Sequence, residues 1–253
     1  MNASVHTVYQ ARNMADFSAG ALGPLVLVNR QHPLQSGFSV ALSAPDAGYP
    51  QILLEMQAAK MLAACIRAVD GSGRIVPVSG WRSHAEQQSI WDDTLEKEGP
   101  EFTHQYVAKP GCSEHESGLA IDLAEAADTI DFIRPAFPYE GVCGAFRRAA
   151  ARYGFIERYR AEKTALTGIA AEPWHFRYVG VPHALLMEQK GLCLEEYVAA
   201  LAERPMACTL ENGCTATVRR FAADAALPPA RGPRQISADN TGGVIVTDWE
   251  AAR

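Results

Sequence analysis

The segment SEHESGLAID, residues Ser113 to Asp122, decides how the rest of the chain is interpreted. Its second half alternates, so that Leu119 and Ile121 share one face of a predicted strand while Asp122 lies on the other. An acidic side chain on the inner face or the cleft face of a strand needs a partner. His115, seven residues before Asp122, is the first candidate for that partner.

A second histidine lies in a similar setting. His175 ends the sequence Glu172-Pro173-Trp174-His175, in another strand-like segment. Two imidazoles and one carboxylate from separate strands make a three-ligand set that leaves one tetrahedral position open for water. We expect zinc, because nitrogen and oxygen ligands in a fixed tetrahedral cage suit it, and a set without cysteine argues against a purely structural site. The other histidines are interpreted as structural or surface residues: His6, His32, His84, His104 and His183.

Two further side chains complete a set for metal-assisted amide hydrolysis. Pro173 disfavours a helix from Glu172 to His175, so Glu172 need not be a ligand and is free to face the attacking water. A carboxylate there takes the proton of the water and returns it to the leaving amine. Arg82, at a corner between a strand and a helix, offers a fork of donors to an oxyanion or to a substrate carboxylate.

Three segments together resemble a known family. SGWRS (residues 79–83), SEHESGLAID (113–122) and EPWHFRYVG (172–180) are similar to the S-G-x-R-S, S-x-H-x-x-G-x-A-x-D and E-x-W-H-x-R-Y-V-G blocks of VanY-type D-alanyl-D-alanine carboxypeptidases. That family includes the bifunctional D,D-peptidases called VanXY. The three blocks occur in the same order, and the resemblance extends from about Leu25 to Tyr197.

The resemblance implies a zinc peptidase of the LAS type, with an α+β fold in which helices flank a central antiparallel sheet. Carried over residue by residue, it implies one zinc ion per chain and assigns the following roles: His115, Asp122 and His175 as zinc ligands, Glu172 as general base, Arg82 as the transition-state stabiliser, and Gln87 and Ser113 as ligands of the substrate's terminal carboxylate. Gln88 is an alternative to Gln87, since an alignment shifted by one residue brings it into the same place. Trp174 is interpreted as a packing residue that also lines the cleft.

The same resemblance implies a substrate. We expect removal of the C-terminal D-alanine from peptidoglycan-precursor stems, extending to the dipeptide D-Ala-D-Ala, which would deplete the target of glycopeptide antibiotics such as vancomycin. Two alternatives stay open. One is an L,D-carboxypeptidase or an endopeptidase of the same fold, and the other is a non-catalytic module that binds wall peptides.

Composition agrees with a folded enzyme that acts on a small peptide. The 253 residues are 48% hydrophobic, and 29 acidic against 23 basic residues give a net charge of −6, which argues against nucleic acid as a partner. We expect no integral membrane segment, since no run approaches 18 apolar residues. The N-terminus lacks the layout of a secretory leader, so we expect a cytoplasmic location. The sequence leaves the oligomeric state open.

Periodicity and turn signals predict the elements. Helices are expected at 52–69, 83–98, 140–153, 182–190 and 194–202, and strands at 25–28, 74–79, 118–123 and 174–179. Residues 1–204 are expected to form the peptidase domain. Residues 205–253 form a β extension with hairpins at 207–221 and 234–247. The cysteines are interpreted as reduced thiols, with a pair between Cys208 and Cys214 as the alternative.

Overall fold

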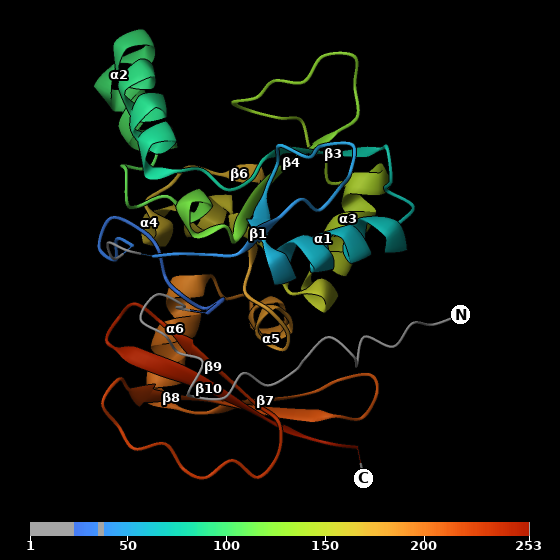
Figure 1. The fold of residues 1–253 in the computed structure, drawn as a ribbon, viewed down its shortest axis with the longest axis vertical. Coiled ribbons are helices and arrows are strands. Elements are labelled where there is room, and N and C mark those ends of the chain that lie inside the picture. Colours follow the sequence, from blue (N-terminus) through green and yellow to red (C-terminus); the bar gives the residue numbers. More distant parts are fainter. Residues whose placement is uncertain (1–22, 35–37, 253) are drawn as a thin grey trace.

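A central antiparallel sheet organises the protein, whose structure, a computed structural model, describes residues 23–34 and 38–252 (Figure 1). The strands lie in the order β3-β4-β6-β5, where the bounds are β3 Ile75–Ser79, β4 Ala120–Glu125, β6 Glu172–Tyr178 and β5 Phe155–Tyr159. All three pairings are antiparallel, which confirms the predicted α+β fold. Pro77 lies on the edge strand β3, where its missing N–H interrupts no second ladder.

Helix α1 (Met56–Ala68) begins four residues later than the apolar spacing predicted. The carboxylate of Glu55 caps it by accepting hydrogen bonds from the backbone N–H groups of Gln57 and Ala58. The residues just before the helix form the short strand β2 (Leu54–Glu55), which pairs with β1 (Leu42–Ser43). The predicted helix start was wrong because the cap and this strand pair fix the chain as extended up to Glu55.

Helix α2 (His84–Tyr106) begins with the predicted capping box between Ser83 and Glu86. The predicted end near residue 98 coincides with a kink, since Gly99 has a φ of 81° and Pro100 follows it. The helical path then resumes to Tyr106. Only Gln87 and Thr103 are buried along α2, which lies at the periphery in Figure 1.

One face of the central sheet packs against α1 and α3 (Gly141–Ala150), which continues into the 3-10 turn η4 (Ala151–Tyr153) and ends at Gly154 as predicted. Apolar residues from both helices and from the sheet form one buried cluster there: Ala58, Leu62, Ile66, Ile121, Leu123, Val142, Phe146, Phe155 and Phe176. This core leaves the opposite face of β4 and β6 free to carry polar side chains.

The segment between α3 and β6 holds elements that the sequence did not predict. Besides β5, it contains the turn η5 (Ala161–Lys163) and the short helix α4 (Thr164–Thr167). After β6 the predicted helices follow as α5 (His183–Lys190) and α6 (Leu194–Glu203). Earlier in the chain, the turn η3 (Glu114–Ser117) connects the segment after α2 to β4 and carries His115.

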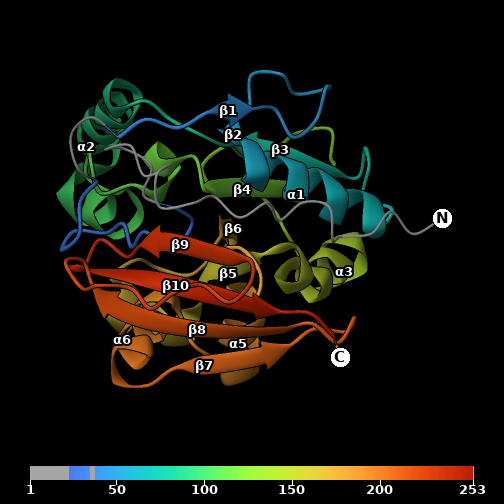
Figure 2. The ribbon, with the colours of Figure 1, turned by 60° about the horizontal axis from the view of Figure 1, so that its bottom comes forward.

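The C-terminal residues form a second antiparallel sheet in the order β7-β8-β10-β9, in front of α5 and α6 in Figure 2. Its strands are β7 Met206–Thr209, β8 Thr215–Ala222, β9 Arg234–Ala238 and β10 Gly243–Glu250, which confirms the β extension and its two hairpins. A second apolar cluster joins this sheet to the rest of the protein: Leu25, Leu27, Ile156, Leu186, Met187, Leu194, Tyr197, Leu201, Met206, Val218 and Ile245. The division into two domains at residue 204 stays a prediction.

Residues 25–28 are buried, but they do not form the predicted strand: Leu25 lies in a turn, and residues 26–28 have no regular secondary structure. They lie beside the C-terminal sheet, because Leu25 N–H donates to Ser237 Oγ and Leu27 N–H donates to the carbonyl of Asp239. All six cysteines are free, as the main interpretation expected. Within the described residues, no helix has the length and apolar character needed to span a membrane.

Candidate metal centre

The turn η3 places His115 above the start of β4. Gly118 ends this turn with a φ of 72°, in the left-handed region, and its carbonyl accepts from Glu55 N–H, so the turn is tied to β2. A side chain at position 118 would disfavour this backbone and press on Glu55. The glycine in the predicted block therefore sets the angle at which His115 meets the strand that carries Asp122.

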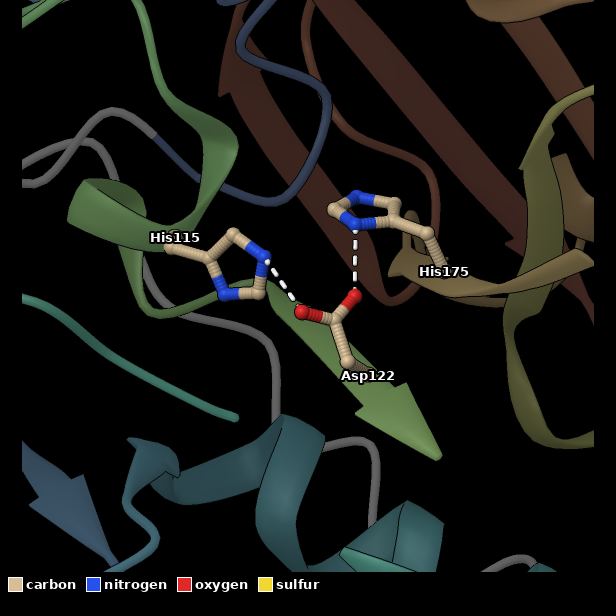
Figure 3. Close-up of side chains that lie close together, drawn as sticks. All are labelled: His115, Asp122 and His175. Atoms are coloured by element: carbon tan, nitrogen blue, oxygen red, sulfur yellow. Dashed lines mark hydrogen bonds and ion pairs between the residues drawn. The ribbon is translucent and has the colours of Figure 1, made fainter. Parts of the chain in front are cut away.

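The three predicted metal ligands converge on one point, as Figure 3 shows. Asp122 on β4 is paired with His175 on β6 in the antiparallel register, and His115 approaches from η3. One donor atom from each lies within 4.8 Å of the other two, and all three residues are buried. In the described part of the chain this is the only such cluster, and His115 and His175 are its histidines. Of the other histidines, His84 bonds Glu116 and His183 bonds Tyr197. His6 lies outside the described residues.

His115 presents its Nε2 atom to the centre. Its Nδ1 lies 2.7 Å from the carbonyl oxygen of Gly80, and since a carbonyl only accepts, Nδ1 carries the proton. Nε2, 3.2 Å from Asp122 Oδ2, therefore holds the lone pair. Gly80 is required at its position because a Cβ there would clash with the carbonyl of Leu53.

His175 presents the other ring nitrogen, Nδ1, which lies 2.9 Å from Asp122 Oδ1. Burial disfavours the charged ring, but the neighbouring carboxylates, Asp122 first, outweigh it and raise the pKa of His175 to about 9. Burial opposes ionisation of Asp122 too, yet His115 and His175 hold its pKa well below the usual range. The centre thus favours a negative carboxylate with positive charge beside it.

This donor set fits a divalent metal ion. Two imidazole nitrogens and a carboxylate oxygen point at one another from buried side chains, an arrangement that a cation between them stabilises. Borderline nitrogen ligands with one carboxylate and no thiolate are typical of catalytic zinc sites with three protein ligands. Cys112 lies three residues before His115 in the sequence, but its thiol is not one of the donors in the cluster.

Glu172 lies at the rim of the centre, with Oε2 3.6 Å from His175 Nδ1. Burial raises the pKa of Glu172 to about 7, against the opposing effects of His175 and Arg82. A carboxyl group with that pKa exchanges a proton readily near neutral pH. The role of Glu172 as general base stays a prediction, which this position and this pKa suit.

Arg82 contacts Oδ2 of Asp122, whereas His175 contacts Oδ1 of the same carboxylate. Its Nη2 is 3.4 Å from Asp122 Oδ2, and the guanidinium also donates to Ser79 Oγ and to Gln87 Oε1. Gln87 is buried and donates its amide N–H to the carbonyl of Ala108. Gln88 instead is exposed and bonds Asp92, so Gln87 is the glutamine that faces the site. A cavity of about 360 Å³ adjoins Arg82 between residues 79–82 and the first turns of α2.

Ser113 and Trp174 lie near the centre without touching the cluster. Ser113 is buried just before η3, where its side chain forms no capping bond. Trp174 packs against the apolar core, and since neighbours on a strand point to opposite faces, it faces away from His175. The substrate roles of Gln87, Ser113 and Trp174 stay predictions. The segments 98–111 and 159–171 meet where the Ala170 N–H lies 3.5 Å from the carbonyl oxygen of Gln105.

Sequence reasoning missed a layer of charged residues behind His175. Glu114, Arg158 and Arg177 are buried, and both arginines donate to Glu114. The centroid of the Tyr159 ring lies 4.9 Å from that of the His175 ring. Burial opposes ionisation of Glu114, but Arg158 and Arg177 hold its pKa well below the usual range. The signal was present, because Glu114 and Arg177 both lie inside the quoted blocks, beside or two residues from a ligand.

Comparison with known proteins agrees with this geometry. Residues 51–181 match the family model VanY, D-alanyl-D-alanine carboxypeptidase. The bifunctional D-Ala-D-Ala dipeptidase and D-Ala-D-Ala carboxypeptidase VanXYC of Enterococcus gallinarum is 36% identical over 204 residues, which cover 79% of this chain and 100% of the relative.

Two solved structures have the same fold. The vancomycin resistance D,D-dipeptidase VanXYg, in complex with a D-Ala-D-Ala phosphinate analogue, matches with a TM-score of 0.86 and 40% identity, covering 90% of this chain and 94% of that one. A variant of the D,D-pentapeptidase VanY in complex with Zn(II) matches with a TM-score of 0.57 and 31% identity, covering 69% and 98%.

Proposed function

The chain belongs to the VanY family of D-alanyl-D-alanine carboxypeptidases, and from this premise we propose that it is a zinc-dependent D,D-peptidase. Its substrates would be peptidoglycan-precursor stems that end in D-Ala-D-Ala, and the dipeptide D-Ala-D-Ala itself. One observation carries the proposal: the donor atoms of His115, Asp122 and His175 lie within 4.8 Å of one another, with the Glu172 carboxylate 3.6 Å from His175.

His115 Nε2, His175 Nδ1 and a carboxylate oxygen of Asp122 would hold one zinc ion per chain. When bound, zinc supplies Lewis-acid activation of water and of the scissile carbonyl. Glu172 takes a proton from the attacking water on its carboxylate and delivers it to the nitrogen of the departing D-alanine. The buried setting of Glu172, which raises its pKa to about 7, suits both the acceptance and the return of that proton.

Arg82 stabilises the charge that develops on the carbonyl oxygen of the substrate. Ser79 Oγ and Gln87 Oε1 hold the guanidinium in place, so little reorganisation is needed when the charge appears. Ser113 and Gln87 are proposed to bind the terminal carboxylate of the substrate. One amide N–H of Gln87 donates to the carbonyl of Ala108, and the second N–H of the same NH₂ group would donate to the carboxylate.

The substrate assignment is tested by a cleavage panel on zinc-loaded protein. D-Ala-D-Ala, a pentapeptide stem ending in D-Ala-D-Ala, a tetrapeptide stem with a terminal L,D bond and a peptide with only internal bonds are compared at equal concentration. We expect release of D-alanine from the first two. Activity on the L,D bond alone would replace this assignment with an L,D-carboxypeptidase, and zinc binding without any cleavage would favour a module that only binds wall peptides.

A cytoplasmic location is part of the proposal. Six unpaired thiols suit a reducing compartment, and a cytoplasmic D,D-peptidase meets its substrates before they are exported. Fractionation of cells that produce the tagged protein tests this directly. Recovery of the protein outside the cytoplasmic fraction would contradict it.

A further inference from the structure

Two buried polar atoms face each other behind the metal centre without a bond. Glu114 Oε2 and His175 Nε2 are 3.6 Å apart, and neither has a hydrogen-bond partner within the described residues. The side chain of Glu114 is 0% exposed and that of His175 is 4% exposed. A buried donor or acceptor left unpaired is costly, so a pair that lies this close has a strong tendency to form the bond.

The other oxygen of Glu114 fixes where this carboxylate sits. Oε1 accepts from Arg158 Nε at 2.8 Å and from Arg177 Nη1 at 2.7 Å. With two guanidinium groups on Oε1, the carboxylate turns Oε2 toward β6, where His175 Nε2 is the facing atom. A carboxylate in this setting is only an acceptor, so the bond to His175 requires a proton on Nε2.

The two guanidinium groups are themselves anchored on opposite sides. Arg158 donates two bonds to Glu195 on α6, at 2.9 and 2.7 Å. Arg177 donates to the carbonyls of Pro24 and Val26, near the start of the described residues. Glu114 thus has little freedom to move away from His175, because its partners are held by separate parts of the fold.

We propose that Glu114 is a positioning residue for the metal centre: by accepting from Nε2–H of His175 it fixes the ring and the tautomer whose Nδ1 lone pair faces Asp122 and the metal. This inference rests on the proposed metal set but not on the identity of the substrate. Carboxylates or carbonyls that hold the second nitrogen of a ligand histidine orient the ring and raise its basicity. Gly80 holds Nδ1 of His115 in the same manner, so each histidine has its own partner.

The sharpest variant is Glu114→Gln. Its amide oxygen can keep the bonds to Arg158 and Arg177, but its amide NH₂ then faces His175 Nε2 and donates to it, which favours the tautomer with a proton on Nδ1. We expect zinc affinity, measured by competition with a chromophoric chelator, to fall by about 10- to 100-fold, the usual effect of losing such a partner. An affinity equal to that of the parent would overturn the proposal.

Glu195→Gln is the matched control. Glu195→Gln removes one partly buried charge from the same network and weakens the hold on Arg158, but residue 195 does not bond His175. We expect its zinc affinity to match that of the parent. An equal loss in both variants would assign the effect to the charge network and overturn the role of the bond to His175. Thermal unfolding of both chelated variants checks that each is folded.

A measurement on the parent protein keeps the test independent of variant folding. With ¹⁵N-labelled histidine and bound zinc, the Nε2–H of His175 is expected as a strongly downfield proton that exchanges slowly with water. A proton at this position that exchanges rapidly would contradict a bond to Glu114. Both readouts are separate from hydrolysis, so the absence of D,D-peptidase activity would defeat the proposed function and leave this inference standing.

Discussion

Asp122 on β4 lies directly opposite His175 on β6 in the antiparallel ladder, with 2.9 Å between Oδ1 of the carboxylate and Nδ1 of the ring. Two of the three proposed ligands are therefore one cross-strand pair, and the backbone bonds of the sheet fix their spacing. The third, His115, comes from the turn that leads into β4. The metal centre is thus assembled on rigid elements, with the apolar core packed behind them.

Removal of the metal is expected to abolish hydrolysis without unfolding the protein. The apolar core between α1, α3 and the sheet contains none of the three ligands, so we expect the fold to persist without the ion. Dialysis against a chelator, followed by activity assays, elemental analysis and circular dichroism, checks this. Stoichiometric zinc should restore turnover, and persistent turnover in metal-free protein would contradict the proposed chemistry.

Glu172→Ala is expected to lower kcat by about 10²-fold or more, since general acid–base groups typically contribute 10²–10⁴-fold. Metal content should stay unchanged, because Glu172 is outside the three-ligand set. Elemental analysis and steady-state kinetics on D-Ala-D-Ala give the two readouts. Glu162→Ala, on the exposed turn η5, is the control and should retain full activity. Unchanged turnover in the Glu172 variant would point to a different base.

Asn240 is expected to stabilise the contact between the C-terminal sheet and the N-terminal segment. Its Nδ2 lies 3.0 to 3.1 Å from the carbonyl oxygens of Leu27, His32 and Pro33. Asn240→Gly keeps the backbone free to hold the φ of 60° and removes these bonds, so we expect a loss of about 1–3 kcal/mol in the free energy of unfolding. Chemical denaturation measures this loss.

Asn240→Ala serves as the comparison for that variant. Alanine removes the same three bonds. In addition, its Cβ makes the left-handed backbone at position 240 unfavourable by about 1 kcal/mol, a cost that glycine does not have. We therefore expect it to be less stable than the glycine variant. Equal stability of both variants and the parent would show that the three carbonyls gain nothing from Asn240.

Acid is expected to destabilise the protein through His183. Burial lowers the pKa of His183 to about 3 from an ordinary 6.5, and its ring nitrogens face the hydroxyls of Tyr197 and Thr247. Below pH 6.5 the unfolded chain gains a proton that the folded chain does not bind. Stability from this group is thus complete above pH 6.5 and falls by about 1.4 kcal/mol per pH unit toward pH 3.

The comparison with His183→Gln isolates this effect, because all other titrating groups are common to both proteins. Denaturation of the chelated proteins at a series of pH values between 5 and 7 gives the two slopes. The parent should lose stability more steeply on acidification. Parallel slopes would show that His183 does not titrate differently in the folded and unfolded states.

Local patterns predicted the elements whose signals lie within a few neighbouring residues. The capping box of Ser83 and Glu86 and the alternation around Asp122 are examples, and both have the expected structure. Strand β5 was missed because Glu157 and Arg158 interrupt its apolar residues. Arg158 is buried only because Glu114 and Glu195, from distant parts of the chain, pair with it.

The residues of the candidate site that lie in the three family-like blocks were predictable from the sequence. His115, Asp122 and His175 come together as expected, and Glu172 and Arg82 flank them. The role of Glu114 was not predictable, since its importance depends on which atom of His175 faces it across the sheet. Spacing in the sequence gives candidate metal ligands. Which ring nitrogen of His175 faces Glu114 depends on how the side chains pack in the folded protein.

The hydrogen bond from Leu25 N–H to Ser237 Oγ joins positions 212 residues apart. A ribosome adding about 5–20 residues per second needs about 10–40 seconds to make the intervening chain. During that time the C-terminal sheet, to which the backbone N–H groups of Leu25 and Leu27 are bonded, is not yet complete. The enzyme therefore reaches its finished form only after release of nearly the whole polypeptide, and nascent chains must be shielded from aggregation until then.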